Sequence, residues 1–240
     1  ESLTRVQLQN LSTAHLRNLS TTQMGALSSE QVARLSPTQI NALDSDQLAV
    51  LSTDHIRAIG ATNIKSLSTD AIRALSSEQV AGLSNSQLQS LQGSQLRALE
   101  SEDVAGLSTS QVAALKPQQV QELGTTQVSA LSTDQVGALT NNQIKLLNTA
   151  QMGALNTDQV KALTSLQVRA LSASQLNALS TDSVMQMETQ DVAALTLTQV
   201  NGLSTSFVRA LSTDQLQALT SAQISVLTYS QLSNLQSGDV

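Results

Sequence analysis

An eight-residue period runs through all 240 residues of this chain and limits what it can fold into. The thirty octets share the pattern Leu-Ser/Thr-x-x-Gln-Val/Ile-x-Ala, without insertion or deletion. Numbered from residue 1, the third octet position is Leu in 28 octets, and the eighth is Val, Ile, Leu or Met in all thirty. A strict period of this kind indicates stacked repeats. We therefore predict one continuous array, 1–240, with no internal boundary.

The polar positions of the octet predict where helices begin. The fourth position is Ser, Thr, Asp, Asn or Gly in 25 octets, and the seventh is Gln in 21. A short oxygen-bearing side chain accepts from a free N–H at a helix start, and Gln three residues later can return a bond to the cap. Ser132 with Gln135, and Ser212 with Gln215, are predicted capping pairs of this kind.

The aliphatic positions predict the core. The Leu before each cap and the aliphatic at the fourth helical residue match a hydrophobic staple, in which the two side chains pack across the helix start. Pro37 and Pro117 both follow the cap, where a helix tolerates a missing N–H. The predicted core residues in the middle of the chain are Leu131, Val136, Leu139, Ile144 and Leu147.

The period also excludes one long helix. If one octet spanned two helical turns, the apolar repeat would be about 4.0 residues per turn, against about 3.6 in an α-helix. The apolar stripe would then drift around the surface of a single long helix. The chain must turn at each Leu-Ser junction, and such short helices are stable only when stacked. The predicted fold is all-α, a solenoid or superhelix of about thirty very short capped helices. A β-solenoid is the alternative, although apolar residues spaced three and five apart would fall on opposite faces of a strand.

Charged residues follow the helix dipole. Ten of the eighteen acids stand at the second helical residue, and nine of the twelve bases at the fifth. Acids early and bases late stabilise a helix, and residues three apart can also pair. Three such pairs are expected on a solvated outer face: Asp54–Arg57, Asp70–Arg73 and Asp158–Lys161.

The column of glutamines leaves two interpretations open. Each Gln can cap its own helix only, which already explains its spacing. Alternatively, the glutamines of successive stacked octets can line up as a hydrogen-bonded ladder along the solenoid. The position is not obligatory, because other residues also fill it: His15, His55, Asn63, Ala71, Asp103, Ser183, Asp191, Phe207 and Asp239.

No pattern in the chain indicates catalysis. His15 and His55, the only histidines, lie five octets apart without regular carboxylate companions, and the chain has no Cys. No nucleophile motif, phosphate loop or calcium loop is present. We therefore expect no enzyme, metal or cofactor. The net charge of −6 is unsuited to nucleic acid, and no apolar run approaches the ~20 residues that insertion into a membrane requires.

Two resemblances follow from the motif. Leu35-Ser36-Pro37-Thr38-Gln39-Ile40 and Leu75-Ser76-Ser77-Glu78-Gln79-Val80 resemble the first-helix segment of TAL-effector repeats over about eight residues. The 34-residue period, base-reading dipeptide and basic surface of that family are absent, so DNA binding is not carried over. The whole array resembles the octapeptide tracts of very long secreted or surface proteins of Gram-negative bacteria. That resemblance implies an extracellular stalk, filament or adhesin region, and no site residues.

The expected function is structural, an extracellular or cell-surface fibre or stalk. Both terminal octets keep the motif, for example Leu3 and Val240, so we expect a longer array or copies that self-associate head to tail or laterally. The alternative is an adhesin-like module that binds protein or glycan through its surface. The octets that depart most from the pattern, 23 and 24, would then be examined first: Ser183, Met185, Met187, Glu188 and Asp191.

Overall fold

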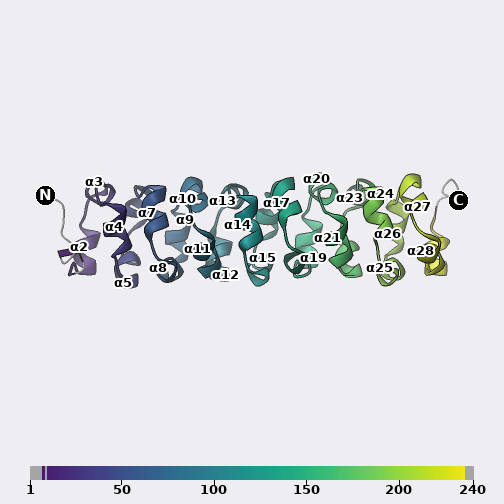
Figure 1. Ribbon diagram of the computed structural model, residues 1–240, viewed down its shortest axis with the longest axis horizontal. Coiled ribbons are helices and arrows are strands. Elements are labelled where there is room, and N and C mark those ends of the chain that lie inside the picture. The colour runs from purple at the N-terminus through teal and green to yellow at the C-terminus, as the bar shows by residue number, and fades with distance from the viewer. Residues whose placement is uncertain (1–6, 9, 236–240) are drawn as a thin grey trace. The chain divides into compact units, whose positions relative to one another are not determined.

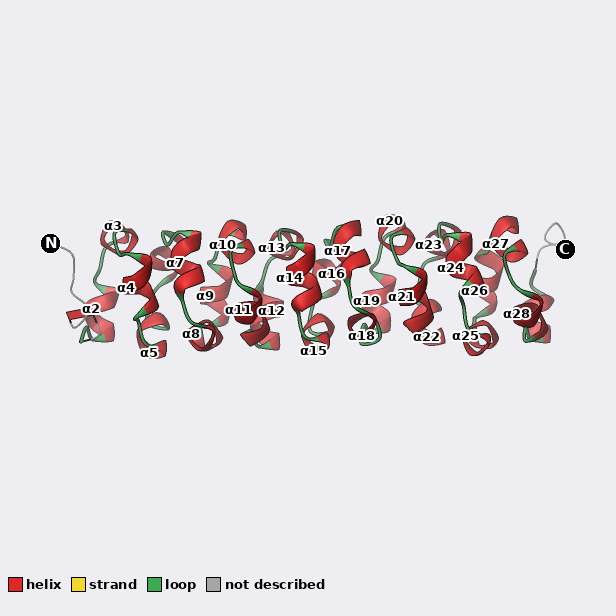
Figure 2. Ribbon diagram, viewed as in Figure 1, coloured by secondary structure: helices red, strands yellow, loops and turns green. Residues whose placement is uncertain are grey.

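The computed structural model describes residues 7, 8 and 10–235, and this part of the chain consists of helices joined by short turns, without a strand (Figure 2). The predicted all-α fold is confirmed, and the β-solenoid alternative is wrong. Leu3, Val240 and Asp239 lie outside the described residues. Within them, each octet from the second to the twenty-ninth begins one helix of four to six residues, which gives the 28 helices α2 to α29 (Figure 1).

The chain divides into two compact units, Glu1–Leu123 and Gly124–Val240, and each is described by itself. The helices of the first unit are α2 (Thr13–Arg17), α3 (Thr21–Gly25), α4 (Ser29–Ala33), α5 (Pro37–Ile40), α6 (Ser45–Ala49), α7 (Thr53–Ala58), α8 (Ala61–Ser66), α9 (Thr69–Arg73), α10 (Ser77–Ala81), α11 (Asn85–Ser90), α12 (Gly93–Ala98), α13 (Ser101–Ala105), α14 (Thr109–Ala114) and α15 (Pro117–Gln121). The helices of the second unit are α16 (Thr125–Ser129), α17 (Thr133–Ala138), α18 (Asn141–Ile144), α19 (Thr149–Gly153), α20 (Thr157–Lys161), α21 (Ser165–Ala170), α22 (Ala173–Leu176), α23 (Thr181–Met185), α24 (Thr189–Ala193), α25 (Leu197–Gly202), α26 (Thr205–Ala210), α27 (Thr213–Gln217), α28 (Ser221–Ser225) and α29 (Tyr229–Leu232).

Reciprocal caps start the helices. At α17, Ser132 Oγ accepts from the Gln135 backbone N–H at 3.1 Å, and the Ser132 N–H donates to Gln135 Oε1 at 2.8 Å. At α27, Ser212 and Gln215 make the same two bonds, at 3.2 and 2.8 Å. Each pair satisfies two backbone donors that a helix start leaves free.

The turns between helices need no glycine. At the end of α17, Leu139 (φ −57°, ψ 132°) is extended, and so is the next cap, Thr140 (φ −70°, ψ 156°). Two consecutive extended residues stop one helix and position the next. No described residue has a positive φ, so ordinary L-residues fit every turn, and the array can use Leu and Ser at each junction.

Within each unit the chain winds into a superhelix whose turns stack. Each helix packs on the helix three places along the chain, as α4 does on α7 and α8 on α11 in the first unit, and α20 on α23 in the second. Hydrogen bonds between turns join residues 25 to 31 apart, for example Arg17 with Ala42 and Gln39 with Leu8. One turn therefore takes between three and four octets.

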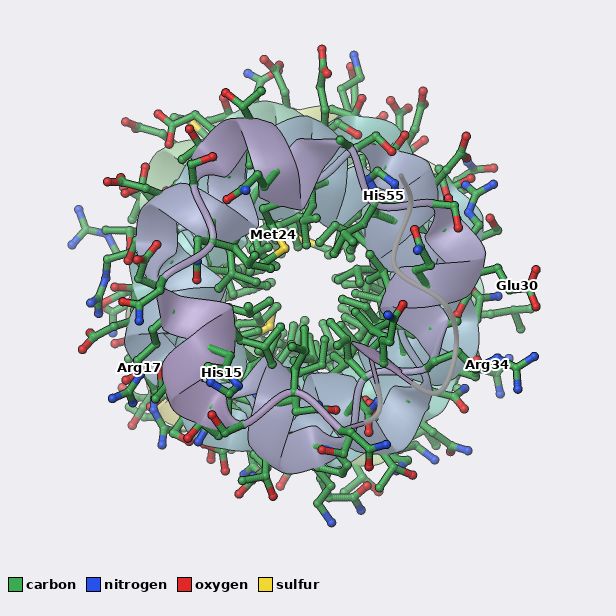
Figure 3. The ribbon with its side chains drawn as sticks, turned by 90° about the vertical axis from the view of Figure 1, so that its left-hand side faces the viewer. His15, Arg17, Met24, Glu30, Arg34 and His55 are labelled. Carbon is green, nitrogen blue, oxygen red and sulfur yellow. The ribbon has the colours of Figure 1, made fainter. Side chains whose placement is uncertain are left out.

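Aliphatic side chains line the inside of each superhelix. Leu131, Val136, Leu139, Ile144 and Leu147 are all at most 4% exposed. In the first unit Met24 points toward the superhelix axis, whereas the outer face carries charged side chains such as Arg17, Glu30 and Arg34 (Figure 3). The third and eighth octet positions thus form a continuous apolar core within each unit, to which every octet adds two side chains.

Candidate functional site: the glutamine column

The most regular polar feature of the structure is the glutamine column, which we define as the seventh position of each octet, from Gln7 to Gln231. This position is the third residue of each helix, where the side chain faces the preceding turn of the superhelix. The glutamines of the described column are buried from Gln39 onward, whereas Gln23 in the third octet is exposed. A buried amide must find partners for both of its polar atoms.

Each amide serves two helices at once. Gln159 Oε1 accepts from the Asn156 N–H at 2.9 Å and so caps α20. Its Nε2 donates to Val128 O at 3.0 Å and Leu131 O at 2.7 Å, residues 31 and 28 positions earlier. Gln199 makes the equivalent bonds to Val168 O and Leu171 O, both at 2.8 Å. The column glutamines therefore cap their own helices and also donate to backbone carbonyls of the preceding turn. We call each of these hydrogen bonds between turns a tie.

Helix termini explain why an amide fits this position. A helix start leaves backbone N–H groups free, and a helix end leaves carbonyls free. Because a turn is not a whole number of octets, each helix start lies over helix ends of the preceding turn. An amide carries one acceptor and one donor group on adjacent atoms. It can therefore satisfy an N–H above and carbonyls below with one side chain.

Two replacements in the column keep the bond to the preceding turn, and one of them also keeps the cap. The ring of His55 places Nδ1 3.0 Å from the Ser52 N and Nε2 2.7 Å from Leu27 O. A neutral imidazole protonated on Nε2 accepts at the first contact and donates at the second, as Gln does. Asn63 keeps the donor alone, with Nδ2 2.8 Å from Leu35 O. His15 is exposed, and the described residues hold no group of three or more His, Asp or Glu placed to bind a metal.

Phe207 cannot make either bond, and an amide from the preceding turn replaces it. Asn177 Oδ1 accepts from the Ser204 N–H at 2.7 Å, the group that a column Gln would cap. Asn177 Nδ2 also donates to Gly202 O at 2.9 Å. The tie between these turns is thus kept with its direction reversed, since the amide now comes from the earlier turn.

Two acids in the column receive hydroxyl donors from the preceding turn. Ser77 Oγ donates to Asp103 Oδ1 at 2.8 Å, and Ser165 Oγ donates to Asp191 Oδ1 at 2.5 Å. Burial raises the pKa of Asp191 above its ordinary value, and the nearby charge of Glu188 raises it further, while the Ser165 bond opposes the shift.

Donor side chains at the first octet position form a second row of hydrogen bonds between turns. Arg17 Nε donates to Ala42 O and Arg57 Nε to Gly82 O, both at 3.2 Å, and Gln89 Nε2 donates to Ala114 O at 2.7 Å. Each acceptor lies 25 residues later. Sequence reasoning treated this position as surface charge and missed the row. The one available signal was that Gln and Asn share the position with Arg and Lys, because all four are donors.

The expected surface pairs form only in part. Arg73 contacts Asp70 at 3.0 Å, as the spacing predicts. Arg57 does not pair with Asp54 and instead donates to Gly82 O. Lys161 lies 3.7 Å from Glu188 of the next turn and not beside Asp158. Two further pairs contribute on the outer face, Arg34 with Glu30 at 3.1 Å and Arg97 with Glu122. All are exposed enough that each contributes little to stability.

The two atypical octets divide between core and surface. Ser183, Met187 and Asp191 are buried, whereas Met185 and the Glu188 side chain are each about half exposed. Met185 lines a surface depression of about 360 Å³ in the second unit, together with Thr181, Ser206, Arg209 and Ala210. This depression offers two apolar side chains, one cationic side chain and two hydroxyls.

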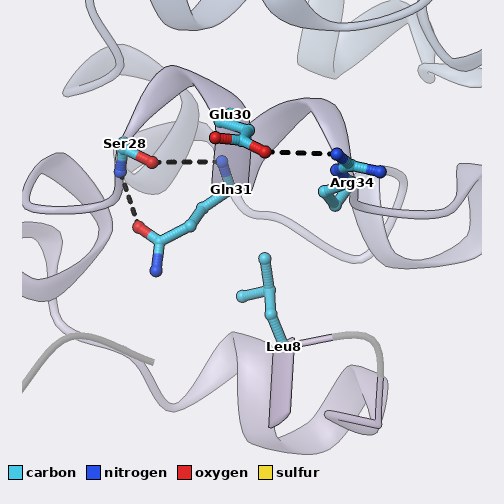
Figure 4. A pocket seen from close by; sticks show the side chains of 5 residues that line it. All are labelled: Leu8, Ser28, Glu30, Gln31 and Arg34. Atoms are coloured by element: carbon cyan, nitrogen blue, oxygen red, sulfur yellow. Dashed lines mark hydrogen bonds and ion pairs between the residues drawn. The ribbon is translucent and has the colours of Figure 1, made fainter. Parts of the chain in front are cut away.

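A smaller pocket of about 150 Å³ lies in the first unit (Figure 4). Its polar groups are already used, since Ser28 and Gln31 cap α4 and Glu30 pairs with Arg34. The apolar part of the wall is Leu8. In the part of the chain that the structure describes, no helix is both long and apolar enough to cross a bilayer.

Comparison with known families agrees with the repeat architecture. The family model described as the ALTTAQ repeat matches seven segments, 3–37, 32–61, 56–85, 110–141, 138–165, 184–221 and 208–237. Each matched segment is 28 to 38 residues long, close to one superhelical turn, and together they cover more than half of the chain. A search among curated proteins gave no significant match. The chain belongs to the ALTTAQ repeat family.

Proposed function

We propose that this chain is a non-enzymatic structural protein that forms an extracellular fibre or stalk by repeat stacking, with self-association head to tail or laterally. The observation that carries the proposal is the repetition of the same ties at successive turns. Gln87, Gln159, Gln199 and Gln215 all donate to carbonyls 28 and 31 residues earlier. Such contacts add with each octet and do not close on themselves.

The chemistry of the recurring residues supports the same proposal. The Leu and Val positions fill the core, and the Ser and Gln positions cap helices and tie turns. Residues already used for folding are not free to act on a substrate. We infer secretion to the cell surface from the resemblance to octapeptide tracts of bacterial surface proteins. An acidic chain is unsuited to nucleic acid partners.

Small-angle X-ray scattering on arrays of increasing octet number tests the fibre. We expect the radius of gyration to grow in proportion to the number of octets at a constant cross-section. Growth as only about the 0.38 power of chain length, which is typical of compact domains, would contradict the proposal. Sedimentation over a wide concentration range tests self-association, and a strict monomer throughout would exclude the filament form.

A second function, recognition of protein or glycan, is favoured by the depression beside Met185. It combines the exposed apolar side chain of Met185 with Arg209, and the least regular octets, 23 and 24, supply Thr181 and Met185 to its wall. A glycan array probed with the intact chain tests it, with a variant in which octets 23 and 24 carry the consensus. Binding that survives the replacement would exclude this site.

A further inference from the structure

Asp191 occupies a position of the glutamine column where a hydrogen-bond donor is expected. Its side chain is 1% exposed, and Oδ1 accepts from Ser165 Oγ at 2.5 Å. A Gln here would donate to the carbonyls 28 and 31 residues earlier, Leu163 O and Val160 O. An ionised carboxylate can only accept, so it cannot make this tie.

Asn63 shows that a shorter side chain reaches the carbonyl. It stands at the same octet position, and its Nδ2 lies 2.8 Å from Leu35 O, 28 residues earlier. A protonated Asp has the size and shape of Asn, with an O–H in place of the N–H donor. Protonated Asp191 can therefore donate to Leu163 O while its other oxygen keeps the Ser165 bond.

We propose that Asp191 is a proton-operated tie between two turns of the superhelix, closed when the carboxyl is protonated and open when it is ionised. The closed state holds α24 to the carbonyl end of the preceding turn at Leu163. The open state leaves a buried anion that faces carbonyl oxygens, which weakens the contact between the turns. The rest of the core is unaffected, because each octet contacts only neighbouring turns.

Charged groups of both signs lie on the elements around Asp191. Glu188, the cap of α24 itself, adds negative charge and is paired with Lys161 of α20 at 3.7 Å. Among the helices that pack on α24, α21 carries Arg169 and α27 carries Asp214. Asp182 lies on the preceding helix, α23, and is exposed.

The sign of the pH dependence follows from the raised pKa of Asp191. A carboxyl whose pKa is higher in the folded than in the unfolded chain stabilises the fold when it is protonated. This contribution is complete below the ordinary Asp pKa of 3.8 and is lost as the pH rises through the raised value. The contact between these turns is therefore tighter in acid.

Hydrogen exchange of the full chain, expressed as protection factors for peptides of α21 and α24, tests the tie from pH ~4 to ~8, where perturbed carboxyls titrate. In the unchanged chain we expect protection to fall about fivefold with rising pH, the effect of one net hydrogen bond. Asp191→Asn keeps the donor at every pH, so its protection stays high and flat. Asp191→Ala has no donor, so its protection stays low. The matched control, Asp182→Asn, behaves like the unchanged chain.

Three results would overturn the proposal. Asp191→Ala could match the unchanged chain in acid, which would mean that relief of a buried charge acts without a tie. Asp191→Asn could keep the pH dependence of the unchanged chain. The change in protection could also be equally large at α17, which would place its origin outside this contact.

Discussion

Replacing Gln119 by Met removes three hydrogen bonds and leaves a side chain of similar length. Gln119 Oε1 accepts from the Lys116 N–H at 2.9 Å, and Nε2 donates to Leu88 O and Leu91 O, both at 2.9 Å. The residue is 6% exposed, so water cannot replace these partners without opening the contact. The substitution therefore removes the hydrogen bonds of Gln119 while a side chain of similar size keeps its packing.

The magnitude follows from the number of bonds. A net contribution of about 1 kcal/mol for each bond gives a loss of about 3 kcal/mol. Each 1.4 kcal/mol is a factor of ten, so the local opening constant should rise roughly a hundredfold. The effect should stay in the turns that hold residues 88–91 and 116–119, because stacked repeats contact only their neighbours.

The neighbouring residue supplies the control. Gln118 lies on the same helix, α15, and is exposed, so Gln118→Met leaves the ties intact. Native-state hydrogen exchange on both variants should show faster opening at α11, α12 and α15 only for Gln119→Met. Equal exchange in the two variants would refute the assignment of the column as the tie between turns.

Three further predictions concern the core, the repeat unit and the reversed tie. Leu131→Ala should cost about 2–5 kcal/mol by leaving a cavity, seen as faster exchange in the turns around it, and unchanged exchange there would exclude Leu131 from the core. Deleting one residue of an octet should lower the melting temperature more than deleting a whole octet, which keeps the spacing of all ties, and equal melting would exclude the octet as the unit. Asn177→Ala should cost about 1 kcal/mol more in the unchanged chain than in a Phe207→Gln background, because Gln can cap Ser204 itself. Denaturant unfolding of the four chains measures the difference, and additive effects would contradict the compensation.

The local half of the structure could be predicted from the sequence. Caps, staples and helix starts depend on residues at most four apart, and the spacing of Ser132 and Gln135 contains all the information that their two bonds need. The winding of the chain depends instead on how helix ends pack in three dimensions. No residue pattern states how many octets make a turn, so the partners of the Gln amides could not be named.

Competition between nearby carboxylates and distant backbone carbonyls explains why some ion pairs predicted from the sequence do not form. The spacing of Arg57 permits a pair with Asp54, three residues away, but its Nε donates to Gly82 O, 25 residues later. An exposed ion pair contributes little, whereas a carbonyl at a helix end needs a donor. The row of first-position donors therefore follows the backbone of the next turn and not the nearest carboxylate.

The mismatch between the octet and the superhelical turn is what makes the column work. If a turn held a whole number of octets, each helix start would lie over another helix start, and free N–H groups would face N–H groups. With partners 28 and 31 residues away, neither of them four whole octets, each start faces a helix end, and one amide serves both. The complementarity belongs to the two backbones, so the amide can come from either turn, as Asn177 shows beneath Phe207. Selection on this array is therefore expected to preserve a donor and an acceptor at each contact, and not a Gln at each seventh position.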